Sequence, residues 1–185
     1  SHIIGCMERH AGGTIVYGQG NFHFVGFDEQ PFMLLYHCNF GYPIVSENTV
    51  LIEPDGVKVV ARDAEGDVPT HAEFQKPTHD YNEQVFYHDI PKVQGDESFA
   101  SLYNQELKLG TYVKFNRSQF SKFGQWKMMG EGDYVVGLEP ANAIPEGRDV
   151  VRKRGELEMI QPGEVRTFEF EIGVIDTPED LKHIF

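Results

Sequence analysis

The segment FMLLYHCNF, residues 32–40, gives the clearest indication of the fold of this chain. It is a nearly continuous apolar run of the kind found in strands that are buried on both faces. A second run, YVVGLE (134–139), ends at Pro140, which cannot continue a strand ladder. Two such runs, far apart in the sequence, predict central strands of a β-protein.

Both runs carry a polar residue at the end of an apolar face. Successive side chains of a strand point to opposite sides. His37 and Asn39 therefore follow Met33 and Leu35 on one face of the first run, and Glu139 ends the second run. We expect the imidazole of His37 and the carboxylate of Glu139 to meet at the mouth of one sheet. The alternative is a core histidine bonded to a backbone carbonyl, and a strand-end glutamate that is simply exposed.

Short strand candidates, separated by glycine and proline, fill the rest of the chain. They lie at 14–17, 21–25, 49–53, 57–61, 84–88, 99–103, 111–115, 132–138 and 164–172. The runs 49–53 and 57–61 flank Pro54-Asp55-Gly56 and predict a hairpin. Residues 62–82 form a polar loop, and helix is expected only at 178–185 and, more weakly, at 97–107. This pattern predicts an all-β, antiparallel β-sandwich in a single domain over residues 1–185.

The composition excludes several classes of partner. The 185 residues include 16 Lys+Arg and 29 Asp+Glu, and 16 − 29 gives a net charge of −13. A nucleic-acid or anionic-membrane partner needs a basic surface, so neither is expected. No apolar run approaches the length of a transmembrane helix. Two cysteines, Cys6 and Cys38, are too few for a disulfide framework and predict a cytoplasmic protein.

The usual cofactor and metal motifs are missing from the sequence. Its eight histidines form no HxH or HExxH pattern. There is no GxGxxG or GxxxxGK[ST] nucleotide motif and no GxSxG nucleophile motif. We therefore expect no cofactor and no metal. A metal-dependent, cupin-type sugar isomerase is the alternative, and it predicts a bound divalent ion.

Three segments together resemble a known family. They are MLLYHCNFGYPIV (33–45), NEQVFYHD (82–89) and WKMMGEGDYVVGLEPAN, followed by PEGR (126–148). In this order they are similar to a bacterial family within the galactose mutarotase-like (aldose 1-epimerase) superfamily. The similarity runs from about residue 27 to 174, including the closing strands at 157–173. It implies a galactose mutarotase-like supersandwich that binds a small-molecule sugar on a concave face.

The resemblance also implies roles for individual residues. YHCNFG (36–41) is similar to the histidine strand of aldose 1-epimerases, and LEP (138–140) is similar to their glutamate strand. By this similarity His37 is the catalytic acid and Glu139 the catalytic base of mutarotation, which needs no nicotinamide. Four further residues in or near the shared motifs are expected to bind the sugar: Asn39, Glu83, Trp126 and Lys127.

The chain also departs from the epimerases. Members of the superfamily are longer, and the arginine and second histidine of their N-terminal half are not found here. The resemblance therefore implies the C-terminal portion of such a domain, with a sandwich incomplete at its N-terminus. A non-catalytic carbohydrate-binding module or an inactive fragment is the alternative function. An incomplete sandwich exposes strand edges, which favours a homodimer.

Overall fold

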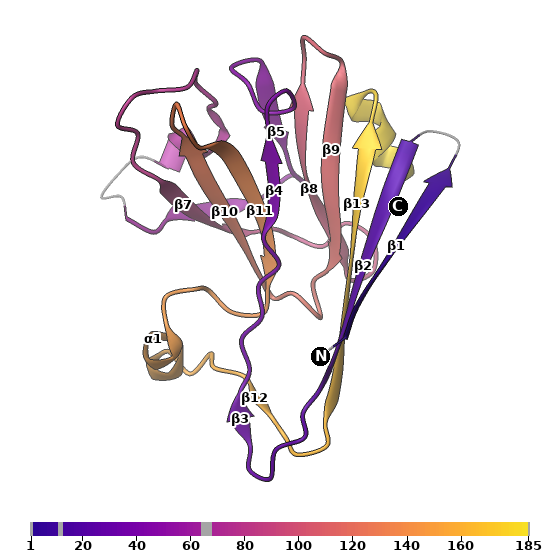
Figure 1. The fold of residues 1–185 in the computed structure, drawn as a ribbon, viewed down its shortest axis with the longest axis vertical. Helices are drawn as coiled ribbons and strands as arrows, with labels where there is room; N and C mark the ends of the chain where they lie inside the picture. Colours follow the sequence, from indigo (N-terminus) through magenta and orange to yellow (C-terminus); the bar gives the residue numbers. More distant parts are fainter. Residues whose placement is uncertain (1, 11–12, 64–67, 185) are drawn as a thin grey trace.

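The computed structural model describes residues 2–10, 13–63 and 68–184, and forms a sandwich of two antiparallel sheets (Figure 1). The first sheet has the order β1 (His2–His10), β2 (Gly13–His23), β13 (Val165–Ile175), β9 (Leu109–Asn116), β8 (Glu97–Asn104) and β5 (Thr49–Ile52). The second has the order β4 (Cys38–Gly41), β11 (Tyr134–Ala141), β10 (Lys122–Met129), β7 (Gln84–Asp89) and β6 (Lys58–Ala61). The predicted antiparallel β-sandwich is confirmed.

Smaller elements complete the chain. A two-stranded sheet pairs β3 (Gln30–Pro31) with β12 (Met159–Ile160), below the main sandwich in Figure 1. Among the described residues, the α-helix α1 (Arg148–Lys153) and the 3-10 helix η1 (Val68–Ala72) lie in connections between strands, and a second 3-10 helix, η2 (Pro178–His183), follows β13. No helix among the described residues is long and apolar enough to cross a bilayer.

The core lies between the two sheets. Phe115 of β9 stacks on Phe123 of β10 with a ring-centroid distance of 5.1 Å, and both side chains are buried. Leu102 and Val113 on the first sheet and Leu138 on the second belong to the same buried cluster. Because side chains alternate along a strand, each residue that enters this core sends its neighbours to the outer face. This alternation decides which residues of the second sheet can meet a ligand.

The segment 32–40 is less regular than the sequence predicts. Only its end is a strand, β4, and the residues before it run alongside the end of β11 through isolated hydrogen bonds. For example, the Tyr36 amide donates to the Pro140 carbonyl at 3.1 Å. The predicted alternation of faces nevertheless holds. Leu34, Tyr36 and Cys38 belong to the core cluster, which leaves His37 on the other side.

The predicted hairpin around Pro54-Asp55-Gly56 is wrong. Gly56 does have the positive φ of a turn residue, at 90°. However, β5 pairs with β8 in the first sheet, whereas β6 pairs with β7 in the second. The turn therefore carries the chain from one layer to the other. A local turn signal fixes the reversal of the chain but not which strands then pair.

Two predictions about helices also need correction. The weak helix expected at 97–107 is wrong, because residues 97–104 form β8, a strand between β9 and the edge strand β5 in which seven consecutive residues are buried. The helix α1 was not expected from the sequence. The C-terminal helix is present as η2, which begins with a capping box between Thr177 and Asp180.

Candidate functional site

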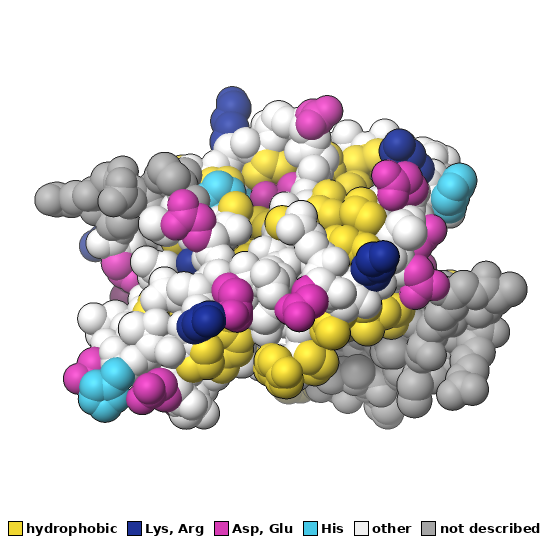
Figure 2. All heavy atoms as spheres, turned by 90° about the horizontal axis from the view of Figure 1, so that it is seen from above, with side chains coloured by type: hydrophobic (Ala, Val, Ile, Leu, Met, Phe, Trp, Pro, Cys, Tyr) yellow, Lys and Arg dark blue, Asp and Glu magenta, His cyan; other side chains and the backbone are white. Residues whose placement is uncertain are grey.

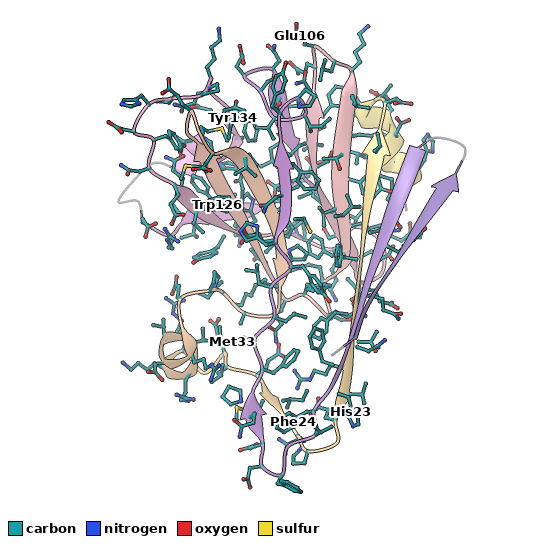
Figure 3. The ribbon with its side chains drawn as sticks, in the orientation of Figure 1. His23, Phe24, Met33, Glu106, Trp126 and Tyr134 are labelled. Atoms are coloured by element: carbon teal, nitrogen blue, oxygen red, sulfur yellow. The ribbon has the colours of Figure 1, made fainter. Side chains whose placement is uncertain are left out.

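The outer face of the five-stranded sheet carries the predicted histidine–glutamate pair. On β10, Phe123 and Met129 point into the core, so Gly124 and Trp126 lie on the outer face. Glu139 of β11 lies opposite Gly124 in register and therefore shares this face. Figure 3 shows Trp126 on this sheet.

His37 and Glu139 are in direct contact. The Nε2 atom of His37 lies 2.8 Å from Oε1 of Glu139. The imidazole is 44% exposed, whereas the carboxylate is only 5% exposed. No hydrogen-bond donor is directed at Oε1 with proper alignment, so this buried oxygen still has a free acceptor position. The site therefore combines a solvent-accessible imidazole with a buried carboxylate that can accept a proton from a ligand.

Two glycines make room for this pair. Gly124 and Gly137 lie on the outer face beside Glu139. A Cβ atom at Gly137 would lie 2.7 Å from Oε1 of Glu139 and 2.8 Å from Cε1 of His37. A Cβ atom at Gly124 would lie 3.0 Å from Oε2 of Glu139. Glycine in a strand interior often marks such a close approach, so these positions had a usable signal in the sequence.

Trp126 and Glu83 extend the site across the sheet. The indole of Trp126 meets the imidazole of His37 edge to face, with ring centroids 5.4 Å apart. Its Nε1–H donates to Oε2 of Glu83 at 2.8 Å. The other oxygen of Glu83 accepts from Arg62 at 2.9 Å. Arg62 and Trp126 both donate hydrogen bonds to Glu83, and these bonds hold the indole ring of Trp126 against the imidazole of His37.

The two carboxylates of the site have opposite electrostatic surroundings. Burial raises the pKa of Glu139 above its ordinary value. The charge of His37 lowers this pKa by less than burial raises it, and the charge of Glu83 adds a smaller rise. The pKa of Glu83 is lowered, first by the hydrogen bond from Arg62 and then by that from Trp126. The Glu139 carboxylate is therefore a stronger base than an ordinary glutamate, whereas Glu83 holds its negative charge more firmly than an ordinary glutamate.

The structure separates the remaining predicted sugar ligands. Asn39 of β4 lies opposite Gly137 in register and is exposed on the outer face, near the pair. Lys127 lies on the inner face, where it is 1% exposed and its Nζ donates to the Thr70 carbonyl at 2.7 Å. Burial lowers the pKa of this amine to about 8. His37, Asn39, Glu83, Trp126 and Glu139 therefore share one face, and Lys127 lies on the other.

Other types of chemistry find little support at this site. Burial, together with the charge of Glu139, raises the pKa of the Cys38 thiol to about 12, so this thiol is not a ready nucleophile. The described residues contain no group of three or more His, Cys, Asp or Glu side chains that could hold a metal ion.

One large hollow lies elsewhere, on the outer face of the six-stranded sheet. It has a volume of about 510 Å³ and is lined by side chains of β2, β8, β9 and β13. It contains neither His37 nor Glu139. Polar side chains of this hollow form hydrogen bonds with each other; for example, Nε2 of Gln19 donates to Oε1 of Glu169 at 2.7 Å. Its size makes this hollow a candidate ligand site. The outer face of the five-stranded sheet is the stronger candidate, because Oε1 of Glu139 there is a buried acceptor without an aligned donor. Reactive groups are a better guide to a functional site than volume alone.

Comparison with known proteins identifies the family and the fold relatives of this chain. Residues 21–174 match the family described as "Domain of unknown function (DUF4432)". This chain belongs to the DUF4432 family. A comparison with curated proteins finds no match.

Solved structures relate the fold of this DUF4432 chain to the galactose mutarotase-like proteins. A candidate aldose 1-epimerase from Klebsiella pneumoniae superposes with a TM-score of 0.83 at 18% identity, over 98% of this chain and 52% of the other. A galactose mutarotase related enzyme from Lactobacillus acidophilus gives a TM-score of 0.66 at 13% identity, over 95% and 62%. A galactose mutarotase-like protein from Lactobacillus casei gives 0.57 at 14%, over 93% and 62%. The predicted galactose mutarotase-like sandwich is confirmed.

The DUF4432 chain spans about half the length of the Klebsiella protein. The similarity therefore concerns the fold, and the activity of the longer proteins does not follow from it. One residue outside the predicted set supports the site. Arg62 donates a hydrogen bond to Glu83, lies at the start of a polar loop and had no signal in the sequence.

Proposed function

We propose that this DUF4432 chain binds a small sugar on the outer face of its five-stranded sheet and interconverts the sugar's anomers by general acid–base catalysis. The observation that carries the proposal is the contact between the exposed imidazole of His37 and the buried, partly unpartnered carboxylate of Glu139. Mutarotation needs two proton-transfer groups and no redox cofactor, which is the chemistry that this pair offers.

In this proposal Glu139 acts as the base and His37 as the acid. The Glu139 carboxylate takes the proton of the anomeric hydroxyl while the His37 imidazolium protonates the ring oxygen. The bond between C1 and the ring oxygen then breaks and leaves an open-chain aldehyde. Rotation about the C1–C2 bond presents the other carbonyl face, and the reverse proton transfers close the ring as the other anomer.

The remaining residues of the outer face would bind and orient the sugar. Trp126 offers an apolar surface beside the imidazole, and aromatic rings suit the C–H face of a pyranose. Asn39 and Glu83 supply hydrogen-bonding groups on either side of it. Acidic side chains are scattered over the face that Figure 2 shows, and the net charge of the chain is −13, which suits an uncharged ligand better than a phosphorylated one.

The direct test is the rate at which freshly dissolved α-D-glucose and α-D-galactose equilibrate, followed by polarimetry or NMR. We expect Glu139→Gln and His37→Asn each to lower the catalysed rate by about 10²–10⁴-fold, the usual contribution of one general acid or base. Wild-type protein that leaves the spontaneous rate unchanged contradicts the proposal for this chain.

A second pair of side chains provides the matched control. His79 and Glu131 are also in contact, with Nδ1 to Oε2 at 3.2 Å, but both side chains are more than half exposed. Glu131→Gln and His79→Asn remove the same chemical groups from the surface. We expect neither change to alter the rate, which distinguishes a specific site from a general effect of charge.

A non-catalytic carbohydrate-binding module is the second candidate. The chain spans about half of its Klebsiella relative, so part of a catalytic site could lie outside it. Sugar binding without faster anomerisation would support this second candidate. A cytoplasmic location and a homodimeric state stay predictions.

A further inference from the structure

One row of residues crosses the outer face of the five-stranded sheet from edge to edge. Asn39 of β4 lies opposite Gly137 of β11, and Gly137 lies opposite Trp126 of β10. Trp126 in turn lies opposite Val85 of β7. The Arg62 amide donates to the Val85 carbonyl at 2.8 Å, so Arg62 continues the row just past the end of β6. The row therefore runs from Asn39 at one edge to Arg62 at the other.

The Arg62 side chain is linked to the middle of this row through Glu83. Its Nη2 atom donates to Oε1 of Glu83 at 2.9 Å, and Oε2 of Glu83 accepts from the indole of Trp126 at 2.8 Å. Each carboxylate oxygen therefore has a donor, and the two donors come from different parts of the sheet. Val85, which separates them in the row, is buried. Glu83 thus joins two side chains that flank a buried valine.

His37 depends on side-chain contacts because no regular strand holds it. It precedes β4, in the segment that runs alongside the end of β11 through isolated hydrogen bonds. Two contacts confine its ring: Nε2 lies 2.8 Å from Oε1 of Glu139, and the indole of Trp126 meets it edge to face at 5.4 Å. Aromatic pairs prefer such edge-to-face geometry. A shift of the indole would therefore turn the imidazole as well.

We propose that Arg62 is a positioning residue of the site. By holding Glu83 it fixes the indole of Trp126, and through the indole it sets the direction of the His37 imidazole, without touching the sugar. This inference rests on the proposed function and extends it to a residue outside the predicted set. Misplacing a reacting group lowers the rate of the chemical step more than it weakens binding, so loss of Arg62 should appear mainly in kcat.

The test measures anomerisation by Arg62→Met, with α-D-glucose and α-D-galactose as substrates and NMR exchange as the assay. For the sugar that the wild type converts faster, we expect kcat to fall about 10–100-fold with KM nearly unchanged. Arg62→Lys keeps the positive charge but not the planar guanidinium, and should recover part of the rate.

Fluorescence provides a second measurement, because Trp126 is the only tryptophan of the chain. Its emission therefore reports the surroundings of this indole alone. In Arg62→Met the indole should be held less firmly and meet more water, which shifts the emission to longer wavelengths. Arg62→Lys should lie between this variant and the wild type.

Asp63→Asn is the matched control. Asp63 is the other carboxylate that Arg62 contacts, at 2.5 Å, and its side chain is exposed. Its substitution should change neither kcat nor the emission. Melting curves check the fold of each variant, and Arg62→Met should melt close to the wild type because its pair with Glu83 is partly solvated.

The outcomes separate this inference from the proposed function. An active wild type with an unchanged kcat in Arg62→Met overturns the inference alone. A fall in kcat without a shifted emission also overturns it, because the effect would not pass through Trp126. A raised KM at unchanged kcat overturns it as well, since Arg62 would then bind the sugar itself. A wild type that does not accelerate anomerisation overturns both.

Discussion

Two histidine–glutamate pairs of this molecule have the same chemistry and opposite surroundings. His37 and Glu139 meet on the outer face, 2.8 Å apart, with the imidazole 44% exposed. His88 and Glu53 meet inside the sandwich, 2.7 Å apart, with the His88 side chain fully buried. The second nitrogen of His88 contacts Oε1 of Gln125 at 3.1 Å. In turn, Gln125 donates to the His71 carbonyl at 2.9 Å, which fixes the direction of its amide.

The difference lies in what each pair leaves unbonded. Both nitrogens of His88 have partners within the protein, so no group remains to exchange a proton with a ligand. His37 has its imidazole open to solvent, and Glu139 keeps one buried oxygen without an aligned donor. The interior pair therefore supports the fold, whereas the outer pair retains the bonding capacity that a ligand would use. Substitutions in both pairs test this division of roles.

The largest effect on stability is expected for His88→Phe. The ring is of similar size but cannot bond to Glu53 or Gln125, so it leaves a carboxylate with little solvent contact and no partner. Breaking a buried pair in this way typically lowers the free energy of unfolding by about 3–5 kcal/mol. Urea unfolding followed by circular dichroism measures the change.

The double variant His88→Phe with Glu53→Leu sharpens this prediction. Removing both partners should recover part of the lost stability, because no unpaired carboxylate remains in the interior. His37→Asn should lower stability by less than His88→Phe, because the His37 side chain is 44% exposed and water can take its place beside Glu139. A His37→Asn loss as large as that of His88→Phe would contradict the division between the two pairs.

A smaller effect, on activity, is expected for Gly137→Ala. The added methyl would lie 2.7 Å from the Glu139 carboxylate and 2.8 Å from the His37 ring, so the two groups must move apart. Small displacements of catalytic groups cost up to about 10²-fold in rate, and we expect kcat/KM for anomerisation to fall about 10–100-fold. Gly132→Ala is the control, because a Cβ atom there meets nothing within 4 Å. Equal activity of both variants would show that catalysis does not require the present spacing of His37 and Glu139.

The sequence was a good guide to the sandwich and to the pair at its outer face. Alternation along the extended segments placed His37 and Glu139 on a common side, even though residues 32–37 form no regular strand. That success depends on a property of any extended chain, which holds without a complete ladder. The same rule counts against Lys127 as a partner of Trp126, because adjacent residues of one strand face opposite sides.

Other features depend on contacts that local patterns do not contain. The turn at Pro54-Asp55-Gly56 was recognisable, but the choice of β8 and β7 as partners is a matter of tertiary pairing. Arg62 acquires its role only because its guanidinium meets Glu83, 21 residues later. The common face of Trp126 and Glu139 likewise exists only in the register of β10 and β11. Long-range register therefore sets the limit of prediction from one sequence.

The smallest expected effect concerns the stability cost of Glu139 itself. Its folded-state pKa is raised by burial, so its ionisation opposes folding. At pH below the ordinary glutamate range the carboxyl is protonated in both states, and Glu139→Gln should match the wild type. As the pH rises through the folded-state pKa, the wild type loses stability that the neutral amide keeps. At pH 8 we therefore expect Glu139→Gln to be more stable by about 1 kcal/mol, or about 2–4 °C in melting temperature. Melting curves from pH 4 to pH 8 measure this difference, and a gap that narrows as the pH rises would mean that Glu139 is stabilised, rather than strained, by its contact with His37.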